Sequence, residues 1–312
     1  MKLLITGAAG QLGQAFGCEL ENHPNIAVVA CSRSELDITD LNNVRQVITQ
    51  EQPDFVINTA AYTQVDLAET ETETAYLVNQ IGPANLAQVC VDVDIPLIHF
   101  STDCVFDGSK KDAWTEVDST APLSVYGASK LAGEEAVQQI CRKYLIFRVS
   151  WVFSEFGHNF VKTMLNLGST REQLRVVSDQ VGKPTCAREI ARAVVEILPK
   201  HQEQWGLYHL AQPEPISWHG FAQALFNTAE QYQTGSKLIV NEVLPIPTSG
   251  YPTPAERPAN SILDTTKLHK TFALVLSDWQ QSLSQTLAAL EPQASKCDNG
   301  NSDGQNNEQA SG

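Results

Sequence analysis

The chain has 312 residues, of which 42% are hydrophobic and 18% are charged, as is ordinary for a globular protein of one large or two modest domains. Its formal net charge of -15 argues against nucleic acid as a partner, because phosphate binding needs a basic surface. The same acidity argues against docking on an anionic membrane and is typical of a well-solvated surface.

The cysteine pattern and the first residues of the chain bear on the cellular compartment of the protein. Seven cysteines are scattered along the chain, with an odd count and no C-x-x-C pair. This pattern favours a reducing compartment over a disulfide framework or a zinc site. The first residues run directly into a short apolar segment without a charged leader, and no apolar stretch approaches ~18 residues. We therefore expect a cytoplasmic protein with no membrane partner.

A glycine-rich loop follows the first predicted strand, residues 2–6, and precedes a predicted helix that runs to about Leu20. The loop carries Gly7, Gly10 and Gly13 in a G-x-x-G-x-x-G pattern. Such glycines let the backbone approach a pyrophosphate, which then lies at the positive N-terminus of the helix. Glycine turns are common, so the order of strand, loop, helix and strand carries the prediction of a dinucleotide site.

The residues after the second predicted strand, 26–31, bear on the choice of cofactor. An NAD-specific loop usually carries an acidic side chain here to bind the ribose 2′-hydroxyl. Ser32 and Arg33 instead offer a hydroxyl and a cation that can take a 2′-phosphate. The sequence favours NADPH, with NADH left open, and the alternative is that Arg33 is a solvated surface cation. Asp37 and Ile38 are expected to meet the adenine.

Strands and helices alternate over the first 150 residues. Helices are predicted over 41–50, 74–91 and 126–142, and strands over 55–58, 96–101 and 145–149. This alternation predicts an α/β fold with a doubly wound parallel sheet, which binds ligands at the carboxyl ends of its strands. The small residues at 59–61, Ser101 and the glycine loop all fall at that edge. Asn79, inside a predicted helix, could be structural, a proton relay or a plain surface side chain.

Tyr126 and Lys130 form the pair with the clearest chemistry. Their spacing of four places both side chains on one helix face, about a turn apart. An ammonium beside a phenol stabilises the phenolate and lowers the tyrosine pKa. With the Thr102 hydroxyl at the end of a strand, the pair predicts proton transfer to or from an oxygen bonded to carbon.

The second half of the chain offers two candidate ligand contacts. Trp151, just past a strand, could stack on a ring-shaped ligand or be a core aromatic. Residues 245–258 are too rich in proline for a helix or a central strand and predict a rigid loop over a site. Arg257 in that loop could bind a substrate phosphate or a surface carboxylate.

We expect a nucleotide-binding domain over residues 1–150, where strands and helices alternate. Residues 291–312 are polar and lack the apolar surface that offsets ordering entropy, so a disordered tail is predicted.

These motifs resemble a known family. The glycine loop, Thr102 and Tyr126-x-x-x-Lys130 are similar to those of the extended short-chain dehydrogenase/reductases. This resemblance implies a Rossmann-type NAD(P)-binding domain over residues 1–150 and a smaller, mainly substrate-binding α/β domain over 151–290, some of whose segments should return to the Rossmann sheet. A narrower resemblance, to the dTDP-4-dehydrorhamnose reductases, runs from residue 1 to about 290. It is carried by segments 58–66, 101–108, 122–130, 148–153, 159–165, 251–261 and 272–279.

The resemblance implies an activity. It implies an NAD(P)H-dependent oxidoreductase that reduces the 4-keto group of dTDP-4-dehydro-β-L-rhamnose to give dTDP-β-L-rhamnose. This reaction is the last step of dTDP-rhamnose biosynthesis for cell-surface polysaccharide such as the O-antigen of lipopolysaccharide. The substrate partner would be a dTDP-sugar, and a homodimer is left open.

The resemblance also implies roles for individual residues. Tyr126 would protonate the developing alkoxide, Lys130 would depress its pKa and hold the nicotinamide ribose, and Thr102 would donate a hydrogen bond to the carbonyl oxygen. Substrate contacts would include Thr102, Asp103 and Trp151. Cofactor contacts would fall on Gly10, Gln11, Leu12, Asp37, Ile38, Ala61, Tyr62, Thr63, Tyr126 and Lys130.

Two departures from the family pattern stand out. Cys104 occupies a position where the family usually has tyrosine, so a ring contact or a hydroxyl hydrogen bond to the sugar could be lost. Some members bind magnesium through glutamates, one of them in the first helix, but Gln14, Ala15 and Phe16 include no carboxylate. No metal site is predicted, while magnesium stays open by resemblance.

Other functions remain as alternatives. Another nucleotide-sugar 4-ketoreductase or an epimerase would use the same fold. A 4,6-dehydratase ordinarily needs Asp-Glu after the threonine, whereas Asp103 is followed by Cys104. A non-enzymatic, NADP-binding regulatory subunit is disfavoured by the intact set of Thr102, Tyr126 and Lys130.

Overall fold

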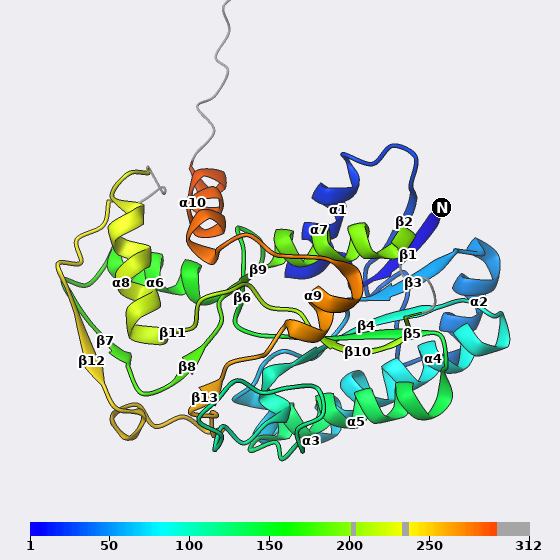
Figure 1. Ribbon diagram of the computed structural model, residues 1–312, viewed down its shortest axis with the longest axis horizontal. Coiled ribbons are helices and arrows are strands. Elements are labelled where there is room, and N and C mark those ends of the chain that lie inside the picture. Colours follow the sequence, from blue (N-terminus) through cyan, green and yellow to red (C-terminus); the bar gives the residue numbers. More distant parts are fainter. Residues whose placement is uncertain (201–203, 233–236, 292–312) are drawn as a thin grey trace, which may run out of the picture.

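The computed structural model describes residues 1–200, 204–232 and 237–291 (Figure 1). The tail predicted to be disordered therefore lies outside the described residues, apart from Glu291. Among the described residues, no helix is long and apolar enough to cross a membrane.

A six-stranded parallel sheet forms the centre of the molecule. Its strand order is β2-β1-β3-β4-β5-β10, which confirms the predicted doubly wound parallel sheet. Strand β10 comes from the second half of the chain and pairs with β5 at one edge. The strands are β1 (Lys2–Thr6), β2 (Ala27–Cys31), β3 (Phe55–Asn58), β4 (Leu97–Thr102), β5 (Tyr144–Val149) and β10 (Gly206–His209).

Alternation along the strands divides the core into two layers, because successive side chains point to opposite faces of a sheet. Leu3 and Ile5 of β1 face one cluster, which includes side chains of α1 (Gln11–Leu20) and α7 (Ala187–Ile197). Leu4 faces the opposite cluster. That cluster packs against α2 (Leu41–Glu51), α4 (Gly82–Asp92) and α5 (Val125–Ile140).

The helix predicted over 74–91 contains a change of helical type. The helical run extends from α3 (Thr72–Tyr76) through a π-helical turn, Leu77–Ile81, into α4. Asn79 lies in the π turn. Such turns are frequent at functional sites, where the extra residue redirects a side chain.

The second half of the chain builds a smaller unit with its own core. Phe153, Phe221, Leu225 and Trp279 are buried in one cluster. Ser217 caps α8 by accepting a hydrogen bond from the Gly220 N–H. The elements are β6 (Val152–Phe153), α6 (Phe160–Gly168), β7 (Gln173–Val177), β8 (Val181–Gly182), β9 (Thr185–Cys186), β11 (Ile216–Ser217), α8 (Trp218–Ala229), β12 (Glu242–Ile246), β13 (Asn260–Ser261) and α10 (Trp279–Leu290). The helix α9 (Thr266–Phe272) instead packs in the core of the main sheet.

The proline-rich segment begins in a strand and continues as a loop. Pro245 lies in β12, which forms a two-stranded sheet with β7 among the residues that the structure describes. A proline is tolerated there because an edge strand leaves one side of its backbone unpaired.

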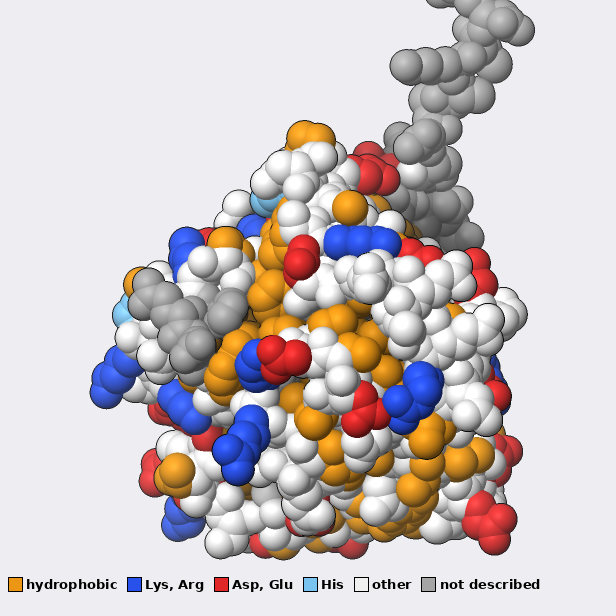
Figure 2. Space-filling view, turned by 90° about the vertical axis from the view of Figure 1, so that its right-hand side faces the viewer, with side chains coloured by type: hydrophobic (Ala, Val, Ile, Leu, Met, Phe, Trp, Pro, Cys, Tyr) orange, Lys and Arg blue, Asp and Glu red, His pale blue; other side chains and the backbone are white. Residues whose placement is uncertain are grey.

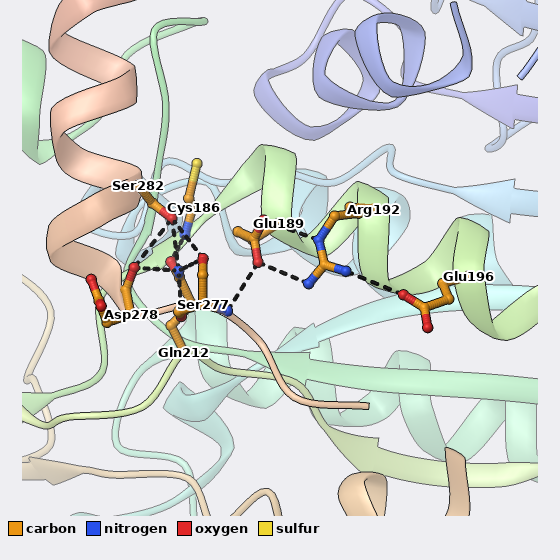
Figure 3. A network of polar contacts seen from close by, with 8 residues as sticks. All are labelled: Cys186, Glu189, Arg192, Glu196, Gln212, Ser277, Asp278 and Ser282. Atoms are coloured by element: carbon orange, nitrogen blue, oxygen red, sulfur yellow. Dashed lines mark hydrogen bonds and ion pairs between the residues drawn. The ribbon is translucent and has the colours of Figure 1, made fainter. Parts of the chain in front are cut away.

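A buried glutamine joins the start of α10 to the segment that leads into α7 (Figure 3). Gln212 accepts a hydrogen bond from the Cys186 N–H at 2.8 Å and donates to the Ser282 hydroxyl at 2.8 Å and the Ser277 carbonyl at 2.9 Å. The Ser277 N–H donates in turn to Glu189 of α7. These bonds fix the start of α10 against the helix that covers the main sheet.

The face at the right of Figure 1 is shown in Figure 2, where hydrophobic side chains lie among scattered charged ones. A pocket of about 280 Å³ lies between the ends of α4 and α5, with Cys90, Ile95 and Cys141 in its wall. These residues precede β4 and β5, so the pocket lies at the amino ends of the strands, away from the predicted ligand edge.

Candidate active site

The glycine loop forms a tight cradle between β1 and α1. Gly7 has φ +66°, and a Cβ there would lie 2.6 Å from the backbone nitrogen of Ala60. A Cβ at Gly13 would lie 2.5 Å from the Gly7 carbonyl oxygen. The helix begins at Gln11 with no acidic residue in its first turn, so its positive N-terminus is not neutralised locally. This geometry fits a dinucleotide pyrophosphate.

Gln11 and Leu12, two predicted cofactor contacts, also pack against the protein. The Gln11 side chain accepts a hydrogen bond from Asn159 at 2.8 Å and donates to the Val152 carbonyl at 3.3 Å. Leu12, the second residue of α1, packs against the core cluster on that side of the sheet. The Gln11 amide therefore links the glycine loop to the start of the second half of the chain.

The loop after β2 contains a carboxylate that the sequence reasoning missed. Glu35 accepts hydrogen bonds from the Ser32 N–H and hydroxyl, both at 2.7 Å, and these lower the pKa of Glu35. Arg33 is 79% exposed, and its Nε lies 3.5 Å from the Asp37 carboxylate. The S-x-x-E spacing, which resembles a capping box, was the available signal for Glu35.

Asp37 and Ile38, the two predicted adenine contacts, are fixed by hydrogen bonds and by packing, respectively. Asp37 also accepts hydrogen bonds from the Thr39 N–H and hydroxyl. Ile38 is buried, and its side chain lies where a Cβ at Gly82 would be. An adenine contact by Ile38 would involve the rim of a side chain that is largely packed.

Asn79 positions the loop after β3, where Ala61, Tyr62 and Thr63 were predicted to contact the cofactor. Asn79 is 1% exposed, accepts from the Tyr62 N–H at 2.9 Å and donates to the Tyr62 carbonyl at 3.0 Å. It also donates to the Ser129 hydroxyl at 3.0 Å. Of the three readings from sequence, these contacts support the structural one. The Tyr62 hydroxyl donates to Glu71.

Thr102 and Asp103 form a compact polar group at the end of β4. The Thr102 hydroxyl donates to Asp103 at 2.9 Å and accepts from the Cys104 N–H at 3.1 Å. Burial raises the pKa of Asp103 to about 6, although hydrogen bonds from Thr102, Ser261 and Ser150 oppose this shift. Burial also raises the pKa of the Cys104 thiol to about 12. Sequence reasoning gave no sign of the two serines.

Tyr126 lies on the first turn of α5, beside this group. Burial is the main cause that raises its pKa, followed by Cys104 and Asp103, while a hydrogen bond with Thr102 lowers it. The prediction that the Tyr126 pKa is lowered is therefore wrong for this structure. A phenol with a raised pKa stays protonated near neutral pH, which is the state that can donate a proton.

Lys130 lies one turn further along α5 and is 3% exposed. Its ammonium donates to the Phe100 carbonyl at 2.6 Å. Burial lowers the pKa of Lys130 to about 8, and the Glu134 carboxylate opposes this shift. The lysine is thus anchored to β4 directly beneath the strand end that carries Thr102.

The two remaining predicted substrate contacts have protein partners. Trp151 is partly buried and stacks on Trp218, with ring centroids 3.4 Å apart. Arg257 donates to the Asp66 carboxylate at 2.9 Å and to the Ala255 carbonyl. The charge of Arg257 also lowers the pKa of the Cys104 thiol, against the larger effect of burial. Of its two predicted partners, Arg257 is paired with the surface carboxylate.

The residues do not fit the magnesium arrangement suggested by resemblance. The first turn of α1 contains no acidic residue. Across the described ranges, no group of three or more histidine, cysteine, aspartate or glutamate side chains is arranged to hold a metal ion.

Comparisons with known proteins show which family the chain belongs to. The family model described as RmlD substrate binding domain matches residues 1–291. A dTDP-4-dehydrorhamnose reductase of Aggregatibacter actinomycetemcomitans is 42% identical over 296 residues, covering 93% of this chain and 99% of that protein.

Solved structures with this name are also similar. The dTDP-4-dehydrorhamnose reductase of Clostridium acetobutylicum has a TM-score of 0.87 and 38% identity, covering 93% of this chain and 99% of that one. That of Bacillus anthracis, in complex with NADP, has a TM-score of 0.84 and 37% identity, covering 91% and 98%. The chain belongs to the dTDP-4-dehydrorhamnose reductase family.

Proposed function

We propose that the protein is an NAD(P)H-dependent reductase that converts dTDP-4-dehydro-β-L-rhamnose to dTDP-β-L-rhamnose. The observation that carries this proposal is the hydrogen-bonded group of Thr102, Asp103 and Tyr126 at the strand edge that also holds the glycine cradle. Relatives with this name match nearly the whole chain. Supply of rhamnose to a cell-surface polysaccharide, from the cytoplasm, is part of the same proposal.

The residues of this chain would bind the cofactor, orient the sugar and protonate its C4 oxygen. When bound, the dihydronicotinamide supplies the hydride. Tyr126 donates its proton to the C4 oxygen of the sugar, and a well-placed general acid typically accelerates such a step ~10²–10⁴-fold. Thr102 polarises the carbonyl once its hydroxyl turns from Asp103 to the substrate oxygen. Lys130 provides a fixed ammonium one turn away, suited to the ribose hydroxyls.

For the cofactor we propose NADPH over NADH. The similar reductase of Bacillus anthracis was solved with NADP, and Arg33 offers an exposed cation after β2. Glu35 opposes this preference, since its carboxylate at Ser32 would repel a 2′-phosphate. The cofactor choice therefore depends on the balance of Arg33 against Glu35.

The rival functions are less well supported. A 4,6-dehydratase would need a glutamate where Cys104 stands, and the pKa of that thiol is raised by burial. The hydrogen bond between Tyr126 and Thr102 argues against a non-catalytic subunit. We also propose that residues 1–150 bind the cofactor and that 151–290 mainly bind the sugar nucleotide.

The test is turnover with defined substrates. Purified protein should oxidise NADPH when dTDP-4-dehydrorhamnose is added, with dTDP-rhamnose as the product, and NADH should be the slower reductant. The assay is run with and without magnesium. An epimerase would change the sugar without net NADPH consumption, and a regulatory subunit would do neither.

A further inference from the structure

Trp151 has an uncommon backbone conformation. Its φ is +47°, in the left-handed region that non-glycine residues rarely adopt. Hydrogen bonds from a second segment hold the backbone at Trp151. The Lys183 N–H donates to the Ser150 hydroxyl, and the Thr185 N–H donates to the Trp151 carbonyl. Strained residues that the surroundings hold in place concentrate at functional sites.

The indole of Trp151 rests on a second indole. Its ring centroid lies 3.4 Å from that of Trp218, and the ring planes differ by 4°. Trp218 is the first residue of α8 and is packed from behind by Phe160, whose ring centroid is 4.6 Å away. Phe160 in turn stacks on buried Phe221. Trp218 is therefore fixed to the core of the second half of the chain.

A glycine makes room for the same indole. A Cβ at Gly182 would lie 2.4 Å from Cε2 of Trp151 and 2.6 Å from its Nε1. The φ of Gly182 is outside the left-handed region, so its backbone conformation does not require glycine. The close approach to Trp151 does.

Two neighbours of Trp151, Ser150 and Gly182, also connect it to the candidate active site. Ser150, the preceding residue, hydrogen-bonds Asp103. Ser261 does the same from β13, where it is the register partner of Gly182. The residues that confine Trp151 are thus direct neighbours of those that hold Asp103.

We propose that Trp218 is a positioning residue for sugar-nucleotide binding, because it fixes the Trp151 indole against Gly182 beside Asp103. This inference rests on the proposed function, in which Trp151 contacts the sugar nucleotide. Trp218 acts through Trp151, so its loss should weaken binding while leaving the proton-donating group intact.

The experiment compares two substitutions at one position. Trp218→Leu keeps an apolar side chain but removes the stacking ring, and Trp218→Phe restores a ring. An aromatic stack contributes enough that Trp218→Leu should raise KM for dTDP-4-dehydrorhamnose roughly 3- to 10-fold. Its kcat and its affinity for NADPH should stay unchanged. Trp218→Phe should return KM close to the wild-type value.

Circular dichroism reports on the stack itself. Two stacked indoles give an exciton couplet, which should be present in the wild type and absent from both Trp218 variants. Trp205→Phe is the matched control, because Trp205 packs against the other core cluster, and this variant should keep the couplet. Gly182→Ala leaves Trp218 intact but displaces Trp151, and should also raise KM.

The outcomes separate the two proposals. A wild-type KM in both Trp218→Leu and Gly182→Ala would overturn the positioning role, as would a missing couplet in the wild type. So would a fall in kcat that Trp218→Phe does not repair. Calorimetry with dTDP-rhamnose gives the affinity without turnover. A wild-type protein that binds it but does not oxidise NADPH with the keto sugar would instead refute the proposed reaction.

Discussion

The glycine cradle can be tested by adding a single methyl group. In Gly13→Ala the new Cβ would lie 2.5 Å from the Gly7 carbonyl oxygen and 2.6 Å from the Cα of Ala8. Ordinary contacts begin near 3.4 Å, so the loop and helix would have to separate by about 1 Å. Both neighbours are backbone atoms, and neither can rotate away.

Overpacking of this kind typically costs about 1–3 kcal/mol, which corresponds to roughly 5- to 150-fold weaker binding if the strain falls on the cofactor loop. The matched control is Gly17→Ala, one turn along the same helix, where a Cβ would meet nothing within 4 Å. That variant should stabilise α1 by roughly 0.5–1 kcal/mol.

The assay is titration of each variant with NADPH, followed by tryptophan fluorescence, together with thermal unfolding. We expect Gly13→Ala to bind NADPH weakly and Gly17→Ala to bind as the wild type does. If Gly13→Ala remained folded and bound NADPH with wild-type affinity, the cradle would not be the pyrophosphate site.

Two further predictions concern charge. The pKa of Lys130 is near 8, so its ammonium is present below that pH and lost above it; kcat/KM should fall as pH rises through 8, and the residual activity of Lys130→Arg should extend to higher pH. A wild-type profile that stays flat well above pH 8 would contradict this assignment. Arg33→Ala should lower the ratio of kcat/KM for NADPH to that for NADH roughly tenfold, and Glu35→Gln should raise it. Equal ratios in all three proteins would show that neither side chain selects the cofactor.

The main sheet could be predicted from sequence because its strands are short apolar runs separated by helical patterns. Residues 55–58 were predicted as a strand with the bounds that the structure has, and all four are buried. The glycine loop was recognisable since its context is local. Each of these signals lies within a few neighbouring residues.

The surroundings of the site could not be predicted in the same way. Trp218 reaches Trp151, and Ser261 reaches Asp103, across long stretches of sequence with no local signal for either pair. The pKa of Tyr126 depends on burial and on Cys104 and Asp103, so the spacing to Lys130 alone gave the wrong direction. Asn79 was ambiguous because the π turn that aims it at Tyr62 leaves no clear mark in the sequence.

Cys104 is the residue whose environment most changed its interpretation. The sequence indicated only that Cys104 replaces the tyrosine that the family usually has at this position. The structure places the thiol within 3.8 Å of the Asp103 carboxylate and near enough to Tyr126 to raise the phenol pKa. Burial keeps this thiol protonated, so Cys104 is an uncharged neighbour of the proposed acid.

The most direct test of the central claim is a single-turnover measurement with Tyr126→Phe. The substitution removes the phenol hydroxyl and keeps the ring, so NADPH and dTDP-rhamnose should bind with wild-type affinity. Reduction of dTDP-4-dehydrorhamnose should slow by ~10²–10⁴-fold, the contribution expected of a general acid. A rate near that of the wild type, with both ligands bound, would contradict the assignment of Tyr126 as the proton donor.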